Sequence, residues 1–331
     1  MDHVDSGHMA LPEFQLLRPR SIDEAVDLLA RYAPNAQILA GGTDLVPSLK
    51  QQLFAPRYLV DLGAIRELRA ILPADGGLHI GSMTTLAHVE RSREIVQRYP
   101  VLHEAVKTVA SPVLRNMGTI GGNICLDTRC LWYNQSFAWR TSCGFCIKKD
   151  GDLCHVAPGG TKCWAAFSAD TPPALLCLEA EIEIASVRGT HRLPLSEFYN
   201  NDGMDRMKLA KDELLTRVIL PARTTGWRGA YRKLRVRGSI DYPLAGIAVA
   251  LQQNGTIADV RVAITGVNPA PLLVKADALH GKQLSEDLAA EIGELAARTA
   301  KPLTTSALTP EYRREMVRVF TRRALQAAVC D

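Results

Sequence analysis

Gln37-Ile-Leu-Ala-Gly-Gly-Thr-Asp-Leu45 is the stretch of this sequence that says most about its fold. The apolar residues at its start predict a short buried strand, and the glycine pair ends that strand before a helical stretch from Val46 to Leu53. A capping-box pattern, Ser21-Ile-Asp-Glu24, opens an earlier helix, and another strand is expected at 58–62. This region therefore predicts an α/β unit with a glycine turn between a strand and a helix.

A second glycine pair stands in Thr119-Ile-Gly-Gly-Asn123, beyond a hairpin signal at Asp75-Gly-Gly77 and helical stretches at 86–91 and 101–108. Paired glycines let backbone N–H groups approach a phosphate closely. One such pair is most often a plain turn, and the nicotinamide-type G-x-G-x-x-G spacing is absent. Two glycine loops could hold one diphosphate from opposite sides, which would suit a dinucleotide such as FAD.

Cysteines are concentrated in one part of the chain. Six of the eight lie within 39 residues, at positions 125, 130, 143, 146, 154 and 163. Thiolates bind soft metals and iron–sulfur clusters, and four cysteines that include the pair Cys143-Gly-Phe-Cys146 suit a structural zinc site equally well. Disulfides are disfavoured because the N-terminus lacks the layout of a secretory signal. Cys177 is expected in the core, and Cys330 is expected to be a free thiol near the end of the chain.

Composition sets the broad class. The 331 residues fit two or three domains, and 47% hydrophobic with 22% charged residues is ordinary for a globular protein. No apolar run could span a bilayer, so we expect a cytoplasmic protein without a membrane partner. The net charge of +4 is scattered, which does not indicate nucleic acid. Residues 1–9 are interpreted as a vector remnant.

Together with Asp170-Thr-Pro-Pro-Ala-Leu175, the two glycine motifs resemble the FAD-binding motifs of the medium subunits of the molybdenum hydroxylases, the xanthine dehydrogenase and carbon monoxide dehydrogenase family. The resemblance covers residues 10–330. It implies an α+β fold, with a two-part FAD-binding domain of the vanillyl-alcohol-oxidase type and a C-terminal α+β domain. The first FAD subdomain would span 10–64, the second 65–222 and the last domain 223–331.

The residues of the C-terminal domain also predict its strands and helices. Strands are expected at 231–235, 245–251 and 258–264, with an Asn254-Gly255 turn between the last two. Amphipathic stretches predict the helices that follow, at 274–279, 285–299 and 310–328.

The resemblance also implies the site residues. The flavin-binding set is Ala40, Gly41, Gly42, Thr43, Asp44, Leu45, Thr119, Gly121, Gly122, Asn123, Asp170 and Lys233. From the residues alone, Thr43 and Asp44 could instead cap a helix, Asp170 could do the same, and Lys233 could be a surface charge.

The cysteines lie in an insert, at about 126–166, that most members of this family lack. It is similar to the insert of the β subunits of 4-hydroxybenzoyl-CoA reductases, which holds an extra [4Fe–4S] cluster. On that resemblance the ligands are Cys130, Cys146, Cys154 and Cys163. Cys125 and Cys143 would be spare.

The function implied is electron transfer, without catalytic residues on this chain. A ferredoxin-like donor would reduce the [4Fe–4S] cluster and then FAD. Partner subunits would carry [2Fe–2S] centres and a molybdopterin cofactor, in a dimer of heterotrimers. The alternatives are a flavoprotein subunit of another molybdenum hydroxylase with structural zinc in its insert, and a stand-alone FAD enzyme, for which the sequence shows no acid–base pair.

Overall fold

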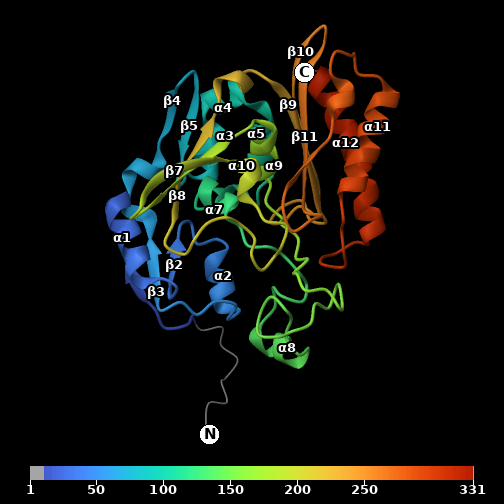
Figure 1. The fold of residues 1–331 in the computed structure, drawn as a ribbon. Helices are drawn as coiled ribbons and strands as arrows, with labels where there is room; N and C mark the ends of the chain where they lie inside the picture. Colours follow the sequence, from blue (N-terminus) through green and yellow to red (C-terminus); the bar gives the residue numbers. More distant parts are fainter. Residues whose placement is uncertain (1–10, 331) are drawn as a thin grey trace.

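The computed structural model describes Leu11 to Cys330, apart from the side chain of Cys330. Figure 1 shows an N-terminal unit in blue, a middle unit in cyan to yellow and a C-terminal unit in orange to red, with strands and helices mixed as the sequence indicates. The proposed remnant at 1–9 lies outside the described residues, and so does the thiol of Cys330. Of the helices between Leu11 and Cys330, none combines the length and the apolar character that a bilayer span requires.

The N-terminal unit is a three-stranded parallel sheet in the order β1-β3-β2. Ser21 caps the first helix, since its Oγ accepts the N–H of Glu24 at 3.1 Å. The glycine turn follows β2, as expected, and leads into a short helix. The elements of this unit are β1 (Gln15–Leu17), α1 (Ile22–Tyr32), β2 (Ala36–Leu39), α2 (Leu45–Lys50), β3 (Tyr58–Asp61), and the 3₁₀ turns η1 (Leu62–Ala64) and η2 (Arg66–Arg69).

The middle unit is a five-stranded antiparallel sheet in the order β4-β5-β8-β6-β7, covered by short helices. Positive φ angles at Asp75 and Gly76 form the expected hairpin turn between β4 and β5. Its strands are β4 (Ile71–Ala74), β5 (Gly77–Gly81), β6 (Glu181–Ser186), β7 (Gly189–Pro194) and β8 (Leu214–Leu220). Its helices are α3 (Leu86–Arg91), α4 (Arg93–Arg98), α5 (Pro100–Lys107), α6 (Pro112–Arg115), α7 (Ile120–Ile124), α9 (Thr171–Cys177), α10 (Leu195–Phe198) and η3 (Ala222–Thr224).

The C-terminal unit is a four-stranded antiparallel sheet in the order β12-β11-β10-β9, with two long helices against one face. The helix expected at 274–279 is wrong: Val274 ends a strand, and only a 3₁₀ turn follows. The elements are β9 (Arg228–Leu234), β10 (Ala245–Asn254), β11 (Thr256–Thr265), β12 (Leu272–Val274), η4 (Asp277–Leu279), α11 (Glu286–Thr299) and α12 (Pro310–Cys330).

The cysteine-rich insert extends from the middle unit and lies beside α2 (Figure 1). Its one regular element is α8 (Phe137–Ser142). Arg140 fixes it there, because Nη2 donates to the carbonyl oxygens of Gln51 at 3.2 Å and Gln52 at 3.0 Å. The Arg140 side chain is 1% exposed and also pairs with Asp150. The insert is therefore packed onto the loop after α2.

Candidate functional site

A cavity of about 930 Å³ lies between the N-terminal and middle units. That volume is near the upper end of the range for small-molecule and cofactor pockets. Eleven of the twelve residues assigned to the flavin from the sequence line it; the exception is Lys233. The motif segments are joined in the cavity wall by the loops at 204–211 and 240–242, of which only the first was not singled out from the sequence.

Gly41 lies where a side chain has no room. A β-carbon there would be 2.0 Å from the carbonyl oxygen of Met117, so the first glycine loop packs directly on the segment that leads into the second. Gly42 has a φ of +71°, which favours glycine. Within Leu11–Cys330, no acceptor receives the backbone N–H groups of residues 41–44. These donors are available to the anionic oxygens of a ligand.

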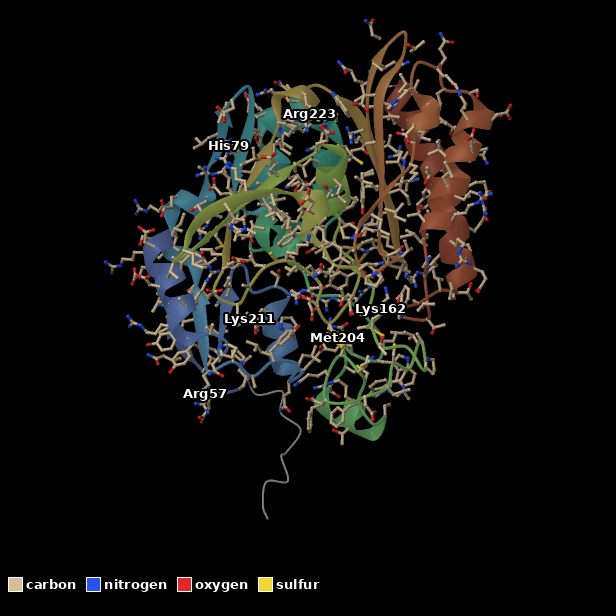
Figure 2. The ribbon with its side chains drawn as sticks, in the orientation of Figure 1. Arg57, His79, Lys162, Met204, Lys211 and Arg223 are labelled. Atoms are coloured by element: carbon tan, nitrogen blue, oxygen red, sulfur yellow. The ribbon has the colours of Figure 1, made fainter. Side chains whose placement is uncertain are left out.

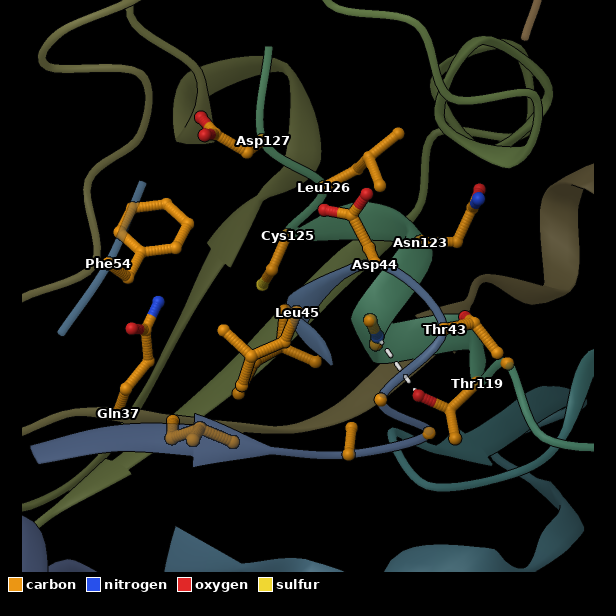
Figure 3. A pocket seen from close by; sticks show the side chains of 18 of the residues that line it. Gln37, Thr43, Asp44, Leu45, Phe54, Thr119, Asn123, Cys125, Leu126 and Asp127 are labelled. Atoms are coloured by element: carbon orange, nitrogen blue, oxygen red, sulfur yellow. Dashed lines mark hydrogen bonds between the residues drawn. The ribbon is translucent and has the colours of Figure 1, made fainter. Parts of the chain in front are cut away.

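The second glycine motif forms the short helix α7. Thr119 caps it, because its Oγ1 accepts the N–H of Gly122 at 3.1 Å, the dashed line in Figure 3. Asn123 Oδ1 accepts both the N–H of Thr171 at 3.1 Å and its hydroxyl at 2.6 Å. Asn123 thus ties the second motif to the third. In Figure 3 the loop that carries Asp44 passes close to this helix.

Asp170 lines the cavity and is held from behind by two donors. The Tyr231 hydroxyl donates to Oδ1 at 2.8 Å, and Lys233 Nζ donates to Oδ2 at 2.9 Å. Lys233 also donates to the carbonyl oxygens of Thr108 and Asp241, each at 2.9 Å. The side chains of Asp170 and Lys233 are 4% and 3% exposed. Since all three ammonium protons have acceptors, Lys233 fixes Asp170 in place and does not itself reach the cavity.

Asp44 is at the N-cap position of α2, yet its side chain makes no capping hydrogen bond. It pairs with Arg129 and accepts the Tyr242 hydroxyl at 3.1 Å. The Arg129 guanidinium stacks 4.3 Å from the centroid of the Tyr242 ring and donates to its hydroxyl at 2.7 Å. Because Asp44 and Tyr242 line the cavity, this contact joins the N-terminal unit, the insert and the C-terminal unit at its edge.

The insert is closed at a narrow neck. The backbones of Arg129 and Ala166 exchange two N–H···O bonds, with N–O distances of 2.7 and 2.8 Å. Just inside the neck, three of the assigned cysteines pack with Tyr133 and Leu53 in a small core of their own. The insert is thus a separate loop whose two ends leave the cavity wall side by side.

The four assigned cysteines, 130, 146, 154 and 163, are each at most 9% exposed. Burial, with the other three thiols adding to it, raises the pKa of Cys130 to about 12. Burial raises the pKa of Cys163 to about 11, and Cys154 and Cys146 add to that shift. Cys130, Cys146 and Cys163 also share one small core, so these three thiols are packed in the same part of the insert.

These thiols do not fit a single metal ion. Within the described part of the chain, no three Cys, His, Asp or Glu side chains are placed to hold one. Zinc requires its thiolates at about 2.3 Å from the metal. The four buried thiols are the donor set that a [4Fe–4S] cluster takes.

The remaining described cysteines have separate surroundings. Cys125 lines the cavity, and burial raises its pKa to about 11. Cys143 is half-buried beside Ser142, with 3.9 Å between Sγ and Oγ. The Cys177 thiol donates to the carbonyl oxygen of Ala248 at 3.4 Å, inside the core. All seven described cysteines are free thiols.

Sequence reasoning missed a buried charged group between the cavity and the cysteines. Lys148 Nζ lies 2.7 Å from Asp127 Oδ1, Arg206 Nη1 lies 3.7 Å from the same oxygen, and the Tyr133 hydroxyl donates to Oδ2 at 2.8 Å. Burial opposes ionisation of Asp127, but the two cations and the hydrogen bonds outweigh it and lower its pKa. The only available signal was the position of Asp127 and Lys148 within the cysteine-rich stretch.

A second hollow, of about 620 Å³, lies between the insert and helices α11 and α12. We call it the basic groove and define it by Trp164, Arg298, Lys301 and Arg314. Arg318 and Glu294 also line the hollow, and Arg318 pairs with Glu294 and Glu315. Within Leu11–Cys330, the three cations that define the groove have no ion-pair partner. Trp164 follows Cys163 directly, so the groove borders the cysteine group.

Comparison with known proteins gives two family matches. Residues 12–223 match the FAD binding domain in molybdopterin dehydrogenase, and residues 229–328 match the CO dehydrogenase flavoprotein C-terminal domain. The boundary between the matches falls just before β9.

Whole-length relatives agree with this division. The chain is 30% identical to the carbon monoxide dehydrogenase medium chain of Afipia carboxidovorans, over 95% of this chain and 96% of that one. It is 26% identical to a putative xanthine dehydrogenase FAD-binding subunit of Escherichia coli, over 94% of each. A solved carbon monoxide dehydrogenase structure from Hydrogenophaga pseudoflava superposes with a TM-score of 0.79 at 28% identity, covering 97% of this chain and 99% of that one.

Proposed function

Because this chain belongs to the FAD-binding subunits of the molybdenum hydroxylase family, we propose that it is the FAD and [4Fe–4S] electron-transfer subunit of a molybdenum-containing reductase complex. The proposed complex is cytoplasmic and of the 4-hydroxybenzoyl-CoA reductase type. Electrons enter from a low-potential, ferredoxin-like donor and leave towards [2Fe–2S] centres on a small subunit and a molybdopterin cofactor on a large one. The large subunit binds the substrate and removes its phenolic hydroxyl reductively.

One observation carries the proposal: four buried thiols, three of them in one small core, lie in an insert whose two ends meet at the wall of the flavin cavity. A [4Fe–4S] cluster takes four cysteine thiolates around a body larger than one ion. Raised pKa values keep Cys130 and Cys163 protonated, and such protons are released when a metal group binds. Cys130, Cys146, Cys154 and Cys163 are the ligands in this proposal.

The cavity residues have distinct parts in holding FAD, which exchanges electrons in pairs or singly. The free N–H groups of residues 41–44 bind the diphosphate, and Gly41 lets their loop pack directly on the backbone of Met117. Thr119 and Asn123 keep the second glycine loop in shape. Asp170, anchored by Lys233, presents a carboxylate at the far part of the cavity wall.

The basic groove supports the proposed donor. An electron carrier with an acidic surface would be attracted to Arg298, Lys301 and Arg314, and the groove places it beside the segment that contains Cys163. Interfaces of transient electron-transfer partners are small and depend on charge for rapid encounter.

Metal and flavin analysis tests the proposal directly. Anaerobically purified protein is expected to contain about four iron, four sulfide and one FAD per chain, with visible absorption that bleaches on reduction by dithionite. Cys146→Ser and Cys154→Ser should lose iron and keep FAD. One zinc with FAD and no iron would instead support a flavoprotein subunit of another molybdenum hydroxylase with a structural insert. Turnover of a substrate by the isolated chain would support a stand-alone enzyme.

A further inference from the structure

Lys148 is a buried cation whose position is fixed by the insert. Its side chain is 7% exposed. Nζ donates to Asp127 Oδ1 at 2.7 Å and to Thr128 Oγ1 at 2.6 Å, and it lies 4.2 Å from the centroid of the Tyr133 ring. A carboxylate, a hydroxyl and an aromatic face thus hold the ammonium in one place.

This ammonium lies close to one of the four assigned thiols. Thr128 Oγ1 and Cys163 Sγ flank the same glycine, since a β-carbon on Gly203 would lie 3.1 Å from the first and 2.8 Å from the second. The Gly203 N–H also donates to the carbonyl oxygen of Cys163 at 2.9 Å. Burial raises the pKa of Cys163, and the Lys148 charge opposes that rise. The shared contacts at Gly203 and the effect of the Lys148 charge on Cys163 both place the ammonium beside this thiol.

The group around Lys148 combines buried and partly exposed charges. Lys148 and Arg206 are two cations, and Asp127, whose pKa is lowered, is one anion. Tyr133 is neutral, because burial and the neighbouring carboxylate raise the pKa of its hydroxyl. A buried charge requires a partner. Arg206 is 30% exposed, so water screens its charge, whereas Lys148 and Asp127 are buried and paired with each other. The four cysteines next to them become anionic when they bind a metal cluster.

We propose that Lys148 is a positioning residue that raises the reduction potential of the group held by the four cysteines. The inference rests on the proposed function, because it requires a one-electron carrier at those thiols. Reduction there adds one electron and one negative charge, and no bond or proton of Lys148 changes. A fixed positive charge nearby favours the more negative, reduced form. Asp127 and Thr128 hold the ammonium where it has this effect.

The test is the midpoint potential of the iron–sulfur centre in the purified complex, measured by EPR during a redox titration. In Lys148→Met the potential should fall by at least about 59 mV, a tenfold change in the reduction equilibrium of a one-electron couple. Lys148→Arg keeps the charge and should restore most of the shift. Lys162→Met is the matched control: its ammonium lies 3.9 Å from the Trp164 ring centroid at the half-buried edge of the insert (Figure 2), where water screens it.

The other possible outcomes decide whether the inference alone fails or the proposed function fails with it. A normal iron content with an unchanged potential in Lys148→Met would overturn the inference and leave the proposed function standing. If the wild-type complex contains no iron, both the inference and the proposed function are overturned. Iron analysis of the wild-type complex alone identifies that outcome. If Lys148→Met fails to take up iron, Thr128→Val takes its place: it removes the 2.6 Å hydrogen bond at nearly constant shape and should shift the potential in the same direction by less. No shift in that variant would also overturn the inference.

Discussion

The absence of a side chain at Gly41 shapes the flavin cavity, which yields the first prediction. In Gly41→Ala the new methyl group would meet the Met117 carbonyl oxygen at 2.0 Å and force the two glycine loops apart. We expect FAD affinity to fall at least about tenfold, equal to about 1.4 kcal/mol. Flavin fluorescence titration of deflavinated protein measures this. Gly238→Ala, where a β-carbon meets no atom within 4 Å, is the control. Equal FAD affinities of the two variants would contradict the prediction.

The second prediction concerns the buried pair of Asp170 and Lys233. Lys233→Met leaves the carboxylate of Asp170 in the interior with only the Tyr231 hydroxyl as partner. Breaking a buried ion pair from one side costs about 3–5 kcal/mol of unfolding free energy. The double variant Asp170→Asn with Lys233→Met should recover most of the loss, because no buried charge is left. Urea denaturation of Lys233→Met, Asp170→Asn and the double variant measures the difference, and additive losses would show that the two residues do not interact.

Asp127 gives the chain a specific response to acid. Its folded-state pKa is below the unfolded value of 3.8, so the stability it contributes is fully present above that value and is lost as pH falls through the lower, folded pKa. Between pH 5 and pH 3 the wild type should lose more unfolding free energy than Asp127→Asn does. Denaturant titrations at several pH values test this, and parallel losses in the two proteins would refute it.

At the scale of elements, the insert should be separable from the flavin site. Arg129 and Ala166 form a hydrogen-bonded antiparallel pair, whose α-carbons a two-residue Asn-Gly turn can join. We expect a chain with that turn in place of residues 130–165 to keep FAD binding within a few-fold and to contain no iron. A matched variant that keeps the full insert but carries Cys146→Ser should likewise bind FAD and contain no iron. Loss of FAD from the shortened chain would show that the insert holds the cavity in shape.

The elements that sequence predicted well are those with local signals. Ser21 marks a helix start, and the Asp75-Gly76 and Asn254-Gly255 turns mark hairpins, because capping and positive φ depend on the residue itself. The helix expected at 274–279 was wrong, since Val274 completes a strand pair with Val262 and long-range pairing overrides local pattern. The ion pair of Asp44 with Arg129 could not be predicted from the sequence either, because the fold of the insert brings these two residues together.

At the scale of the whole molecule, the proposed function requires electrons to enter beside the insert. The insert contributes residues to the walls of both the cavity and the basic groove. We therefore expect the cysteine group to lie between a donor in the groove and the flavin. The units with family matches thus provide the flavin site and one wall of the groove, and the insert provides the other wall.

The last prediction follows from the charge of that groove. In the whole complex, Arg298→Glu with Lys301→Glu should slow reduction by an acidic ferredoxin about tenfold or more at low salt, because two attractive charges become repulsive. The difference should shrink as salt screens the charges, while reduction by dithionite stays unchanged. Arg57→Glu, on an exposed edge of the N-terminal unit (Figure 2), alters net charge without touching the groove. Equal slowing by Arg57→Glu would mean that total charge, and not this groove, attracts the donor.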